Sequence, residues 1–247
     1  TSNFRAGVNA GNSIAAVGVT NAGAFNTVVG DEAGTAITTA DYNTAIGKGA
    51  GTAIATGTGK NVVVGSLALA ISNTGAENVA IGHQALGSDE KGNRSVAVGA
   101  GALYTQDFDS ATSVYNVAVG YSAGGAVTTG THNTLIGALA GDALTDADFN
   151  VAIGHNSLSI DTLGSKSTAI GRSALATQNF TTATDTFNTA VGFNAGVNVT
   201  TGVQNTLVGG LAGDALTGSG FDGSGNRVVG TDYNTAFGYN SLGADTK

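Results

Sequence analysis

"NVAIGHNSL" occupies residues 150–158, and the same pattern returns as "NVAIGHQAL" at residues 78–86 and as "NTAFGYNSL" at residues 234–242. In its first five residues, small or polar side chains alternate with β-branched ones, and this period of two indicates a β-strand. A glycine then ends the run and marks a turn. A catalytic residue is rarely written twice into one chain, so the recurrence indicates architecture before chemistry.

The five-residue motif recurs along most of the chain. It reads Asn or Ser, Thr or Val, usually Ala, Ile or Val, and Gly, and its copies cover residues 26–30, 43–47, 61–65, 78–82, 95–99, 116–120, 133–137, 150–154, 167–171, 188–192, 205–209 and 234–238. Most motif glycines follow one another at the interval that separates Gly137 from Gly154. The step from Gly47 to Gly65 is one residue longer, and the steps that begin at Gly99, Gly171 and Gly209 are longer still. The usual interval suffices for two short strands and two turns but not for a helical repeat. The sequence therefore predicts an all-β solenoid of about twelve 17-residue coils.

Stacking of the coils would place equal motif positions above one another, so Asn43, Asn61 and Asn78 are predicted to form an amide ladder. We expect Thr, Val and Ile of the motif to fill a thin interior. A second short strand is predicted after each motif glycine, starting at an Ala or Ser such as Ser157. Glycines three residues before the motif, such as Gly75, are predicted turn positions with positive φ.

The other face of each predicted strand carries Asn, Ala and Gly, and such small residues allow another backbone to approach closely. A thin roll has too little interior to stabilise a chain by itself. We therefore expect the chain to form a homotrimer through this small-residue face, and Ala118, Ala152 and Asn150 are the predicted interface residues.

The domain organisation follows from the spacing. "LYTQDFDSATSVYNVAVG" (103–120) and "LATQNFTTATDTFNTAVG" (175–192) align so that Phe108 matches Phe180, and each contains a connection longer than the usual one. We predict degenerate capping coils in residues 1–25 and regular coils in residues 26–217. Long loops are expected at 104–115 and 176–187. An inserted loop is expected at 218–233, followed by the last coil and C-terminal end at 234–247.

Composition excludes several functions. The 247 residues include 40 Gly, no Cys and no Pro, and the formal charge is −8. Nine Lys plus Arg residues form no basic stripe, so no nucleic-acid partner is expected. No apolar run approaches the roughly 20 residues of a membrane span, so membrane insertion is not expected. The glycine-rich stretches lack the lysine of a phosphate loop, and no cofactor is predicted.

The motif copies "NVAIGHNSL", "NVAIGHQAL", "STAIGRSAL" and "SVAVGAGAL" resemble the head repeat of trimeric autotransporter adhesins, the YadA-like head, which is also found in bacteriophage tail fibres. The resemblance covers about residues 26–242. It implies a homotrimer of left-handed parallel β-rolls, intertwined or side by side, displayed outside the cell or on the virion and used for attachment. The chain departs from that family in its longer coils and in its superperiod, a block of four coils, one of them long, whose repetition aligns residues 103–120 with residues 175–192.

The predicted function is therefore a structural attachment module, a rigid fibre or adhesin segment on a virion or cell surface, and not an enzyme. Its expected partners are host-surface glycans or proteins and other fibre or adhesin segments. The aromatic loop residues Tyr104, Phe108, Phe180 and Phe221 are the candidates for receptor contact, although they could equally brace the long loops. The alternative is a passive self-assembling extracellular filament or surface-layer protein without a receptor.

Three sharper functions are less favoured. His83 and His155 lie one superperiod apart without a carboxylate beside them, so we interpret them as variable turn residues and not as acid–base catalysts. A Ser-His-Asp arrangement through Ser157 is disfavoured as well, because no motif supports it. "DADFN" (146–150) and "DGSGN" (222–226) make Asp146, Asp148 and Asp222 weak calcium candidates, because neither turn has a full ligand set. Ice binding by a threonine plane is disfavoured because Thr44, Thr134 and Thr189 are expected to point inward.

Overall fold

The computed structural model describes residues 2–14, 23–217 and 231–243. The chain forms a parallel β-solenoid of about eleven turns with a spacing of about 17 residues, as the sequence predicts. Within the described ranges no helix is long and apolar enough to cross a membrane. The chain divides into two compact units, residues 1–129 and residues 130–247. The two are called the N-terminal unit and the C-terminal unit below, and each is described by itself.

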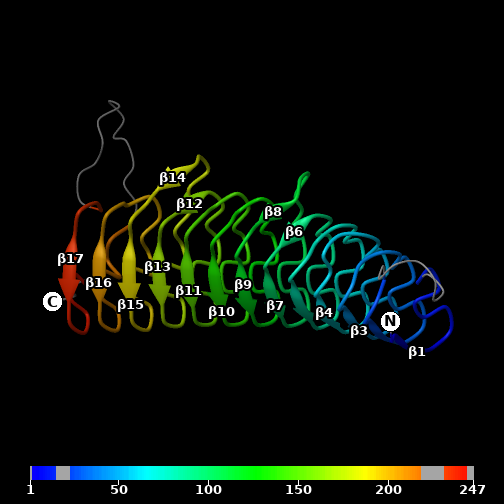
Figure 1. The fold of residues 1–247 in the computed structure, drawn as a ribbon. Coiled ribbons are helices and arrows are strands. Elements are labelled where there is room, and N and C mark those ends of the chain that lie inside the picture. The colour runs from blue at the N-terminus through cyan, green and yellow to red at the C-terminus, as the bar shows by residue number, and fades with distance from the viewer. Residues whose placement is uncertain (1, 15–22, 218–230, 244–247) are drawn as a thin grey trace. The chain divides into compact units, whose positions relative to one another are not determined.

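The N-terminal unit stacks its main strands in sequence order (Figure 1). They are β1 (Phe4–Ala6), β2 (Thr27–Val29), β3 (Thr44–Ile46), β4 (Val62–Val64), β5 (Val79–Ile81), β7 (Val96–Val98) and β9 (Val117–Val119). Each is parallel to the next and in register, so that Val79 pairs with Val96. Strands β6 (Gly92–Asn93) and β8 (Thr112–Ser113) pair separately in a small second sheet. Although residues 1–25 were predicted to be degenerate, β1 pairs in register with β2.

The C-terminal unit repeats this plan. Its main strands are β10 (Thr134–Ile136), β11 (Val151–Ile153), β13 (Thr168–Ile170), β15 (Thr189–Val191), β16 (Thr206–Val208) and β17 (Thr235–Phe237). Strands β12 (Gly164–Ser165) and β14 (Thr184–Asp185) form the small second sheet. Of the predicted insertion 218–233, residues 218–230 lie outside the described residues. Strand β17 nevertheless pairs in register with β16, so the longer step rejoins the ladder.

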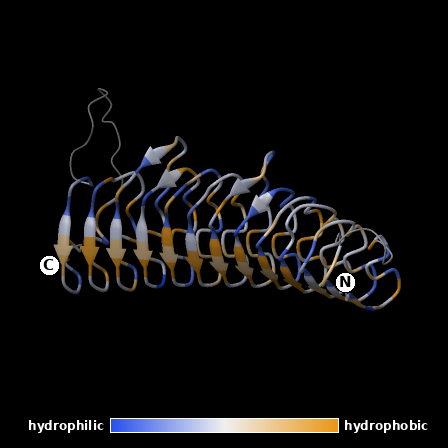
Figure 2. Cartoon of the chain, in the orientation of Figure 1, coloured by the Kyte–Doolittle hydropathy of each residue, from blue (hydrophilic) through white to orange (hydrophobic). Residues whose placement is uncertain are grey.

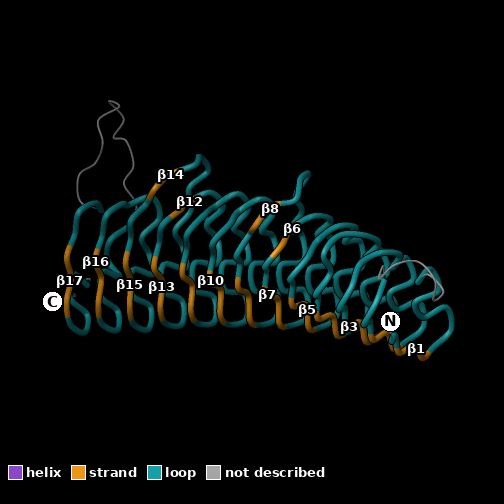
Figure 3. Tube along the Cα trace, viewed as in Figure 1, coloured by secondary structure: helices purple, strands orange, loops and turns teal. Residues whose placement is uncertain are grey.

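Each coil has one main strand, and most of its remaining length is turn (Figure 3). The predicted second strand after the motif glycine is therefore wrong. Three residues in the left-handed region bend each coil instead, as at Phe149, Asn156 and Leu158, with φ of 58°, 56° and 52°. An L-residue in this conformation costs about 1–2 kcal/mol, so the stacking of coils must offset that cost.

Among the glycines three residues before the motif, only Gly23 adopts the predicted positive φ, at 67°; the others do not, namely Gly75, Gly92, Gly130, Gly164 and Gly202. The left-handed residue is the one directly before the motif asparagine, for example Tyr42 with φ of 58°. The glycine is required by close approach instead, because a Cβ at Gly75 would lie 2.8 Å from the carbonyl oxygen of Gly92 in the next coil. Its own carbonyl accepts a hydrogen bond from Asn61 Nδ2 at 2.9 Å. A side chain at Gly75, Gly130 or Gly202 would therefore clash with the backbone of the adjacent coil.

The two faces of the strands are the reverse of the prediction. Ala152 is fully buried and the neighbouring Ile153 is only half-buried, while Ile46 and Ile81 are 39% and 37% exposed. Colour by hydropathy accordingly shows apolar residues along the main strands (Figure 2). The coil is too narrow to hold two β-branched side chains from each strand, so alanine faces inward and Val or Ile faces outward.

The predicted asparagine ladder is confirmed, and it lies inside the coils. Asn43 Nδ2 donates to Asn26 Oδ1 at 3.0 Å, and Asn61 Nδ2 donates to Asn43 Oδ1 at 3.1 Å. Backbone N–H groups join the ladder, because Asn78 N donates to Asn61 Oδ1 at 2.9 Å. Each buried amide thus finds partners in the adjacent coils, which avoids the cost of an unsatisfied polar group.

A single space in each coil, called the shared slot, is filled in one of two ways. In some coils a leucine four residues after the motif glycine fills it, as Leu69 does with full burial. In others that position is glycine and an aliphatic residue three positions later fills the slot: a Cβ at Gly51 would lie 2.7 Å from Ile54 Cδ1. The glycine pairs include Gly34/Ile37, Gly51/Ile54, Gly124/Val127, Gly141/Leu144, Gly196/Val199 and Gly213/Leu216, and the leucine pairs include Leu69/Ser72, Leu86/Asp89, Leu103/Gln106, Leu158/Asp161 and Leu175/Gln178.

Candidate functional site

The outer sheet face consists of the second and fourth motif residues, which point away from the coil interior. In the N-terminal unit these residues are Thr27, Val29, Thr44, Ile46, Val62, Val64, Val79, Ile81, Val96, Val98, Val117 and Val119. In the C-terminal unit they are Thr134, Ile136, Val151, Ile153, Thr168, Ile170, Thr189, Val191, Thr206, Val208, Thr235 and Phe237. In-register pairing aligns them in two columns, one of which carries only Val, Ile or Phe. Contiguous exposed apolar surface of this kind is typical of an interaction site.

The predicted interface residues Ala118, Ala152 and Asn150 do not lie on this face, because all three are fully buried inside the coil. The Asn150 side chain is also fully used. Its Oδ1 accepts from Ser167 N at 2.9 Å, and its Nδ2 donates to the Gly164 carbonyl at 2.9 Å. The small-residue face is the interior of the solenoid, so the prediction that it joins copies of the chain is wrong.

The motif threonines also face outward, contrary to the prediction. Thr44, Thr134 and Thr189 are half-buried and alternate with fully buried residues along their strands. The argument that they point inward therefore does not weigh against an ice-binding plane. What distinguishes the face from such a plane is its second column, where Val and Ile stand in place of hydroxyl groups.

The long loops form a ridge on each unit, and most of their predicted contact residues are not available to a receptor. Phe108 and Phe180 are each only 7% exposed, so they pack beneath the loops instead of projecting from them. Tyr104 is 39% exposed and remains a candidate for contact. Phe221 lies outside the described residues. The bracing interpretation of the two phenylalanines is the one that the structure supports.

A buried polar network supports each ridge. Gln106 Nε2 donates to Asp89 Oδ2 at 2.7 Å and to Ser95 Oγ at 3.1 Å, and its Oε1 accepts from Asn116 Nδ2 at 3.0 Å. Ser95 replaces the usual motif asparagine, so Gln106 bridges the gap in the amide ladder. The C-terminal unit repeats the arrangement with Gln178 bonded to Asp161, Ser167 and Asn188.

This network makes stability depend on pH. Burial raises the pKa of the Asp89 carboxyl to about 6, against hydrogen bonds from Gly92 and Gln106 that lower it. The folded chain therefore holds this proton more tightly than the unfolded chain, whose Asp pKa is about 3.9. The contribution to stability is fully present below about pH 4 and is lost as the pH rises through about 6, by about 2–3 kcal/mol. Thermal melting of Asp89→Asn across pH 4–7 should lack this slope; an identical slope in both proteins would contradict the assignment.

An exposed column runs along the left-handed residues that precede each motif asparagine. Phe25 stacks on Tyr42 at 5.0 Å between ring centroids, and His132 stacks on Phe149 at 4.8 Å. Other members of the column are charged: Arg94 Nε contacts Glu77 Oε2 at 2.9 Å, and the hydrogen bond from Arg94 lowers the pKa of the Glu77 carboxyl. This column was not predicted, although the residue before each motif asparagine is often aromatic or charged.

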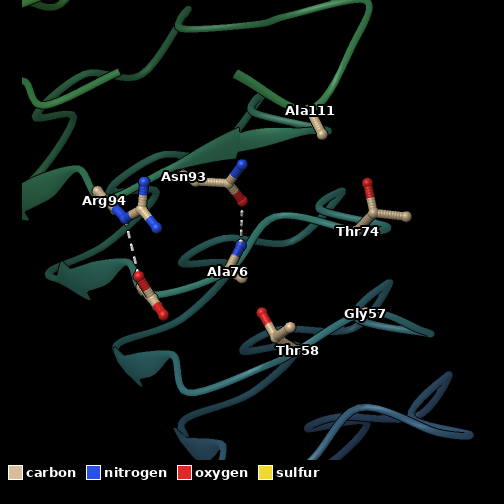
Figure 4. A pocket seen from close by; sticks show the side chains of 8 residues that line it. Gly57, Thr58, Thr74, Ala76, Asn93, Arg94 and Ala111 are labelled. Atoms are coloured by element: carbon tan, nitrogen blue, oxygen red, sulfur yellow. Dashed lines mark hydrogen bonds and ion pairs between the residues drawn. The ribbon is translucent and has the colours of Figure 1, made fainter. Parts of the chain in front are cut away.

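A cleft of about 370 Å³ opens beside this column in the N-terminal unit. Its lining residues are Gly57, Thr58, Thr74, Ala76, Glu77, Asn93, Arg94 and Ala111. They come from successive coils: Asn93 lies in β6, Ala111 lies in the 104–115 loop, and most of the others lie in turns (Figure 4). Asn93 Oδ1 accepts from Ala76 N at 2.8 Å, which ties adjacent coils together at the wall of the cleft. The cleft has no signal in the sequence, because its residues share no motif.

The remaining candidate residues are not brought together. His83 and His155 are exposed at the turn position after the motif glycine, and Ser157 Oγ donates to the Gly154 carbonyl at 2.9 Å. Of the calcium candidates, Asp148 Oδ1 accepts from Thr131 N and Oγ1 at 2.6 and 2.9 Å, Asp146 is exposed, and Asp222 lies outside the described residues. Among the residues described, no group of three or more His, Cys, Asp or Glu is placed to hold a metal ion.

Comparison with known proteins adds no relative to this picture. No protein-family model, no curated protein and no solved structure matches the chain.

Proposed function

We propose that the chain is a rigid attachment segment of a surface fibre or adhesin that associates with copies of itself through the outer sheet face. The observation that carries the proposal is the unbroken apolar column on the exposed side of the main sheet of each unit, which consists of Val and Ile and, in the C-terminal unit, Phe237. An apolar ladder repeated every coil is costly to leave in water, and a second copy offers a surface with the same repeat distance.

The interior strengthens this argument. Alanine occupies the inward strand position of most coils, and Val28, Val63, Leu135 and Leu207 occupy it in four others. Apart from the residue in the shared slot, most coils therefore bury few aliphatic side chains larger than alanine. Small cores leave a chain marginally stable unless association buries further surface. Three copies are the state implied by the resemblance to the YadA-like head repeat, and the proposed interface consists of Val, Ile and Thr in place of the alanines predicted first.

Attachment to a host surface would use the turns of each coil and leave the outer sheet face for association. The ridges and the exposed column lie on turns, which tolerate sequence variation without disturbing the ladder. In a trimer each weak contact would occur three times at fixed spacing, and the higher effective concentration would raise the overall affinity. Attachment of this kind requires display outside the cell or on a virion, which is the proposed location.

The test is adhesion by the purified chain. Fluorescently labelled protein should bind one or more members of a panel of Gram-negative bacteria, Gram-positive bacteria and mammalian epithelial cells. The monomeric variant described in the Discussion should bind the same cells at least about tenfold more weakly, because it loses avidity. End-to-end polymerisation without binding to any of these cells would instead support the passive filament.

A further inference from the structure

We propose that the cleft beside the 104–115 loop binds a neutral sugar unit. This inference rests on the proposed attachment function and names the class of ligand that one part of the surface would recognise. The cleft volume of about 370 Å³ lies at the lower end of the range typical of small-molecule sites. A site of this size suits one or two sugar rings and not a folded protein domain.

The lining combines a small apolar floor with unpaired polar groups. Ala76 is buried in the floor and Ala111 stands across from it on the loop. Thr58 and Thr74 face the same space, and neither hydroxyl makes a hydrogen bond within the described part of the chain (Figure 4). A pyranose ring presents apolar C–H groups and a rim of hydroxyls, which matches methyl groups flanked by donors and acceptors.

Asn93 supplies a donor that the fold does not need. Its Oδ1 accepts from Ala76 N at 2.8 Å. At the equivalent position of the C-terminal unit, Ser165 Oγ accepts from Asp148 N at 3.0 Å, so one oxygen suffices to join the coils. The Asn93 amide N–H₂ is therefore additional to the structural role. It makes no hydrogen bond within the described residues and lies at the cleft wall (Figure 4).

The charge at the cleft is already paired, which favours a neutral ligand. Arg94 donates to Glu77 Oε2 at 2.9 Å and to Ser113 Oγ at 2.6 Å, so neither charge is left for an ionic partner. An added peptide strand is also disfavoured along the wall that Thr74 and Arg94 form, because the backbone donors of these two residues are used. Thr74 N donates to the Glu90 carbonyl and Arg94 N donates to the Ala76 carbonyl, and neither is left to pair with an added strand.

The test uses the full chain and ligand-observed saturation-transfer NMR with methyl glycosides of glucose, galactose, mannose, fucose, N-acetylglucosamine and N-acetylgalactosamine. Sialic acid and glucuronic acid serve as charged comparators. At least one neutral glycoside should bind. Asn93→Ser should raise the Kd of that glycoside about tenfold, which is the equivalent of one hydrogen bond of about 1.4 kcal/mol. Thr74→Val should also raise the Kd of the same glycoside.

Matched controls separate binding from folding. Asn93→Ser keeps an oxygen acceptor, as Ser165 does naturally, so its melting temperature should equal that of the unmodified chain. Ser165→Asn should leave glycoside binding unchanged. The proposal is overturned if no neutral glycoside binds, if only the charged sugars bind, or if Asn93→Ser binds as tightly as the unmodified chain. Cell adhesion that persists in Asn93→Ser without glycoside binding by either protein would reject the sugar site and leave the attachment function standing.

Discussion

The double variant Leu69→Gly with Ser72→Ile should be about as stable as the unmodified chain, although each substitution alone is destabilising. Leu69→Gly empties the shared slot, and deletion of a buried leucine side chain costs about 2–5 kcal/mol. Relief of the left-handed conformation at Leu69, whose φ is 44°, returns about 1 kcal/mol of that loss. Ser72→Ile alone overfills the slot and costs about 1–3 kcal/mol.

Together the two substitutions recreate the arrangement of the preceding coil, where Gly51 makes room for Ile54. Urea denaturation of the two single variants and the double variant should therefore show a coupling free energy of about 3 kcal/mol, at the upper end of the range for residues in contact. The control pairs Ser72→Ile with Leu158→Gly, which lies in the other unit, and here the two effects should add. Additive losses in the Leu69/Ser72 pair would contradict the shared slot.

Ile46→Glu combined with Ile81→Glu should dissociate the assembly into folded monomers. Both isoleucines are more than one third exposed in the single chain, so the monomer tolerates a carboxylate at either position. In the proposed interface each carboxylate would be buried without a partner, at a cost of several kcal/mol. The dissociation constant should rise by more than about a thousandfold, measured by sedimentation, while circular dichroism stays unchanged.

Two controls show whether the location matters. Ile71→Glu with Ile160→Glu makes the same chemical change at isoleucines that are 43% and 46% exposed but lie off the outer sheet face, and it should leave the mass unchanged. Ala80→Leu changes the residue beside Ile81 but points into a coil whose slot already holds Leu86, so it should destabilise the fold by about 1–3 kcal/mol.

Periodicity predicted the solenoid and the amide ladder but placed the two strand faces the wrong way round. Alternation with a period of two separates Asn150 and Ala152 from Val151 and Ile153 without saying which pair is inside. The usual preference for buried Val and Ile decided the prediction, and the narrow coil overrides it. One signal was available: an amide ladder is stable only where water is excluded, so the asparagine face had to be the interior.

The sequence also contains a correlation between two positions three residues apart. A glycine at the first position occurs with a large aliphatic residue at the second, as in Gly51 and Ile54, and a leucine at the first occurs with a polar residue at the second, as in Leu69 and Ser72. The correlation alone does not predict the shared slot, because only the geometry of the coil shows that side chains at both positions reach the same space. The cleft had no such signal, since its polar residues come from different coils and belong to no motif. Left-handed backbone at Tyr42 was likewise hidden, because large L-residues rarely adopt it and so do not indicate it.

Sedimentation equilibrium of the unmodified chain at micromolar concentration tests the account most directly. The chain has a mass of 24.0 kDa, so association of three copies through the outer sheet face predicts a particle of three times that mass. The Ile46→Glu/Ile81→Glu variant should return to the mass of one chain, and the Ile71→Glu/Ile160→Glu control should not. A mass of 24.0 kDa for the unmodified chain would contradict association through the Val and Ile columns.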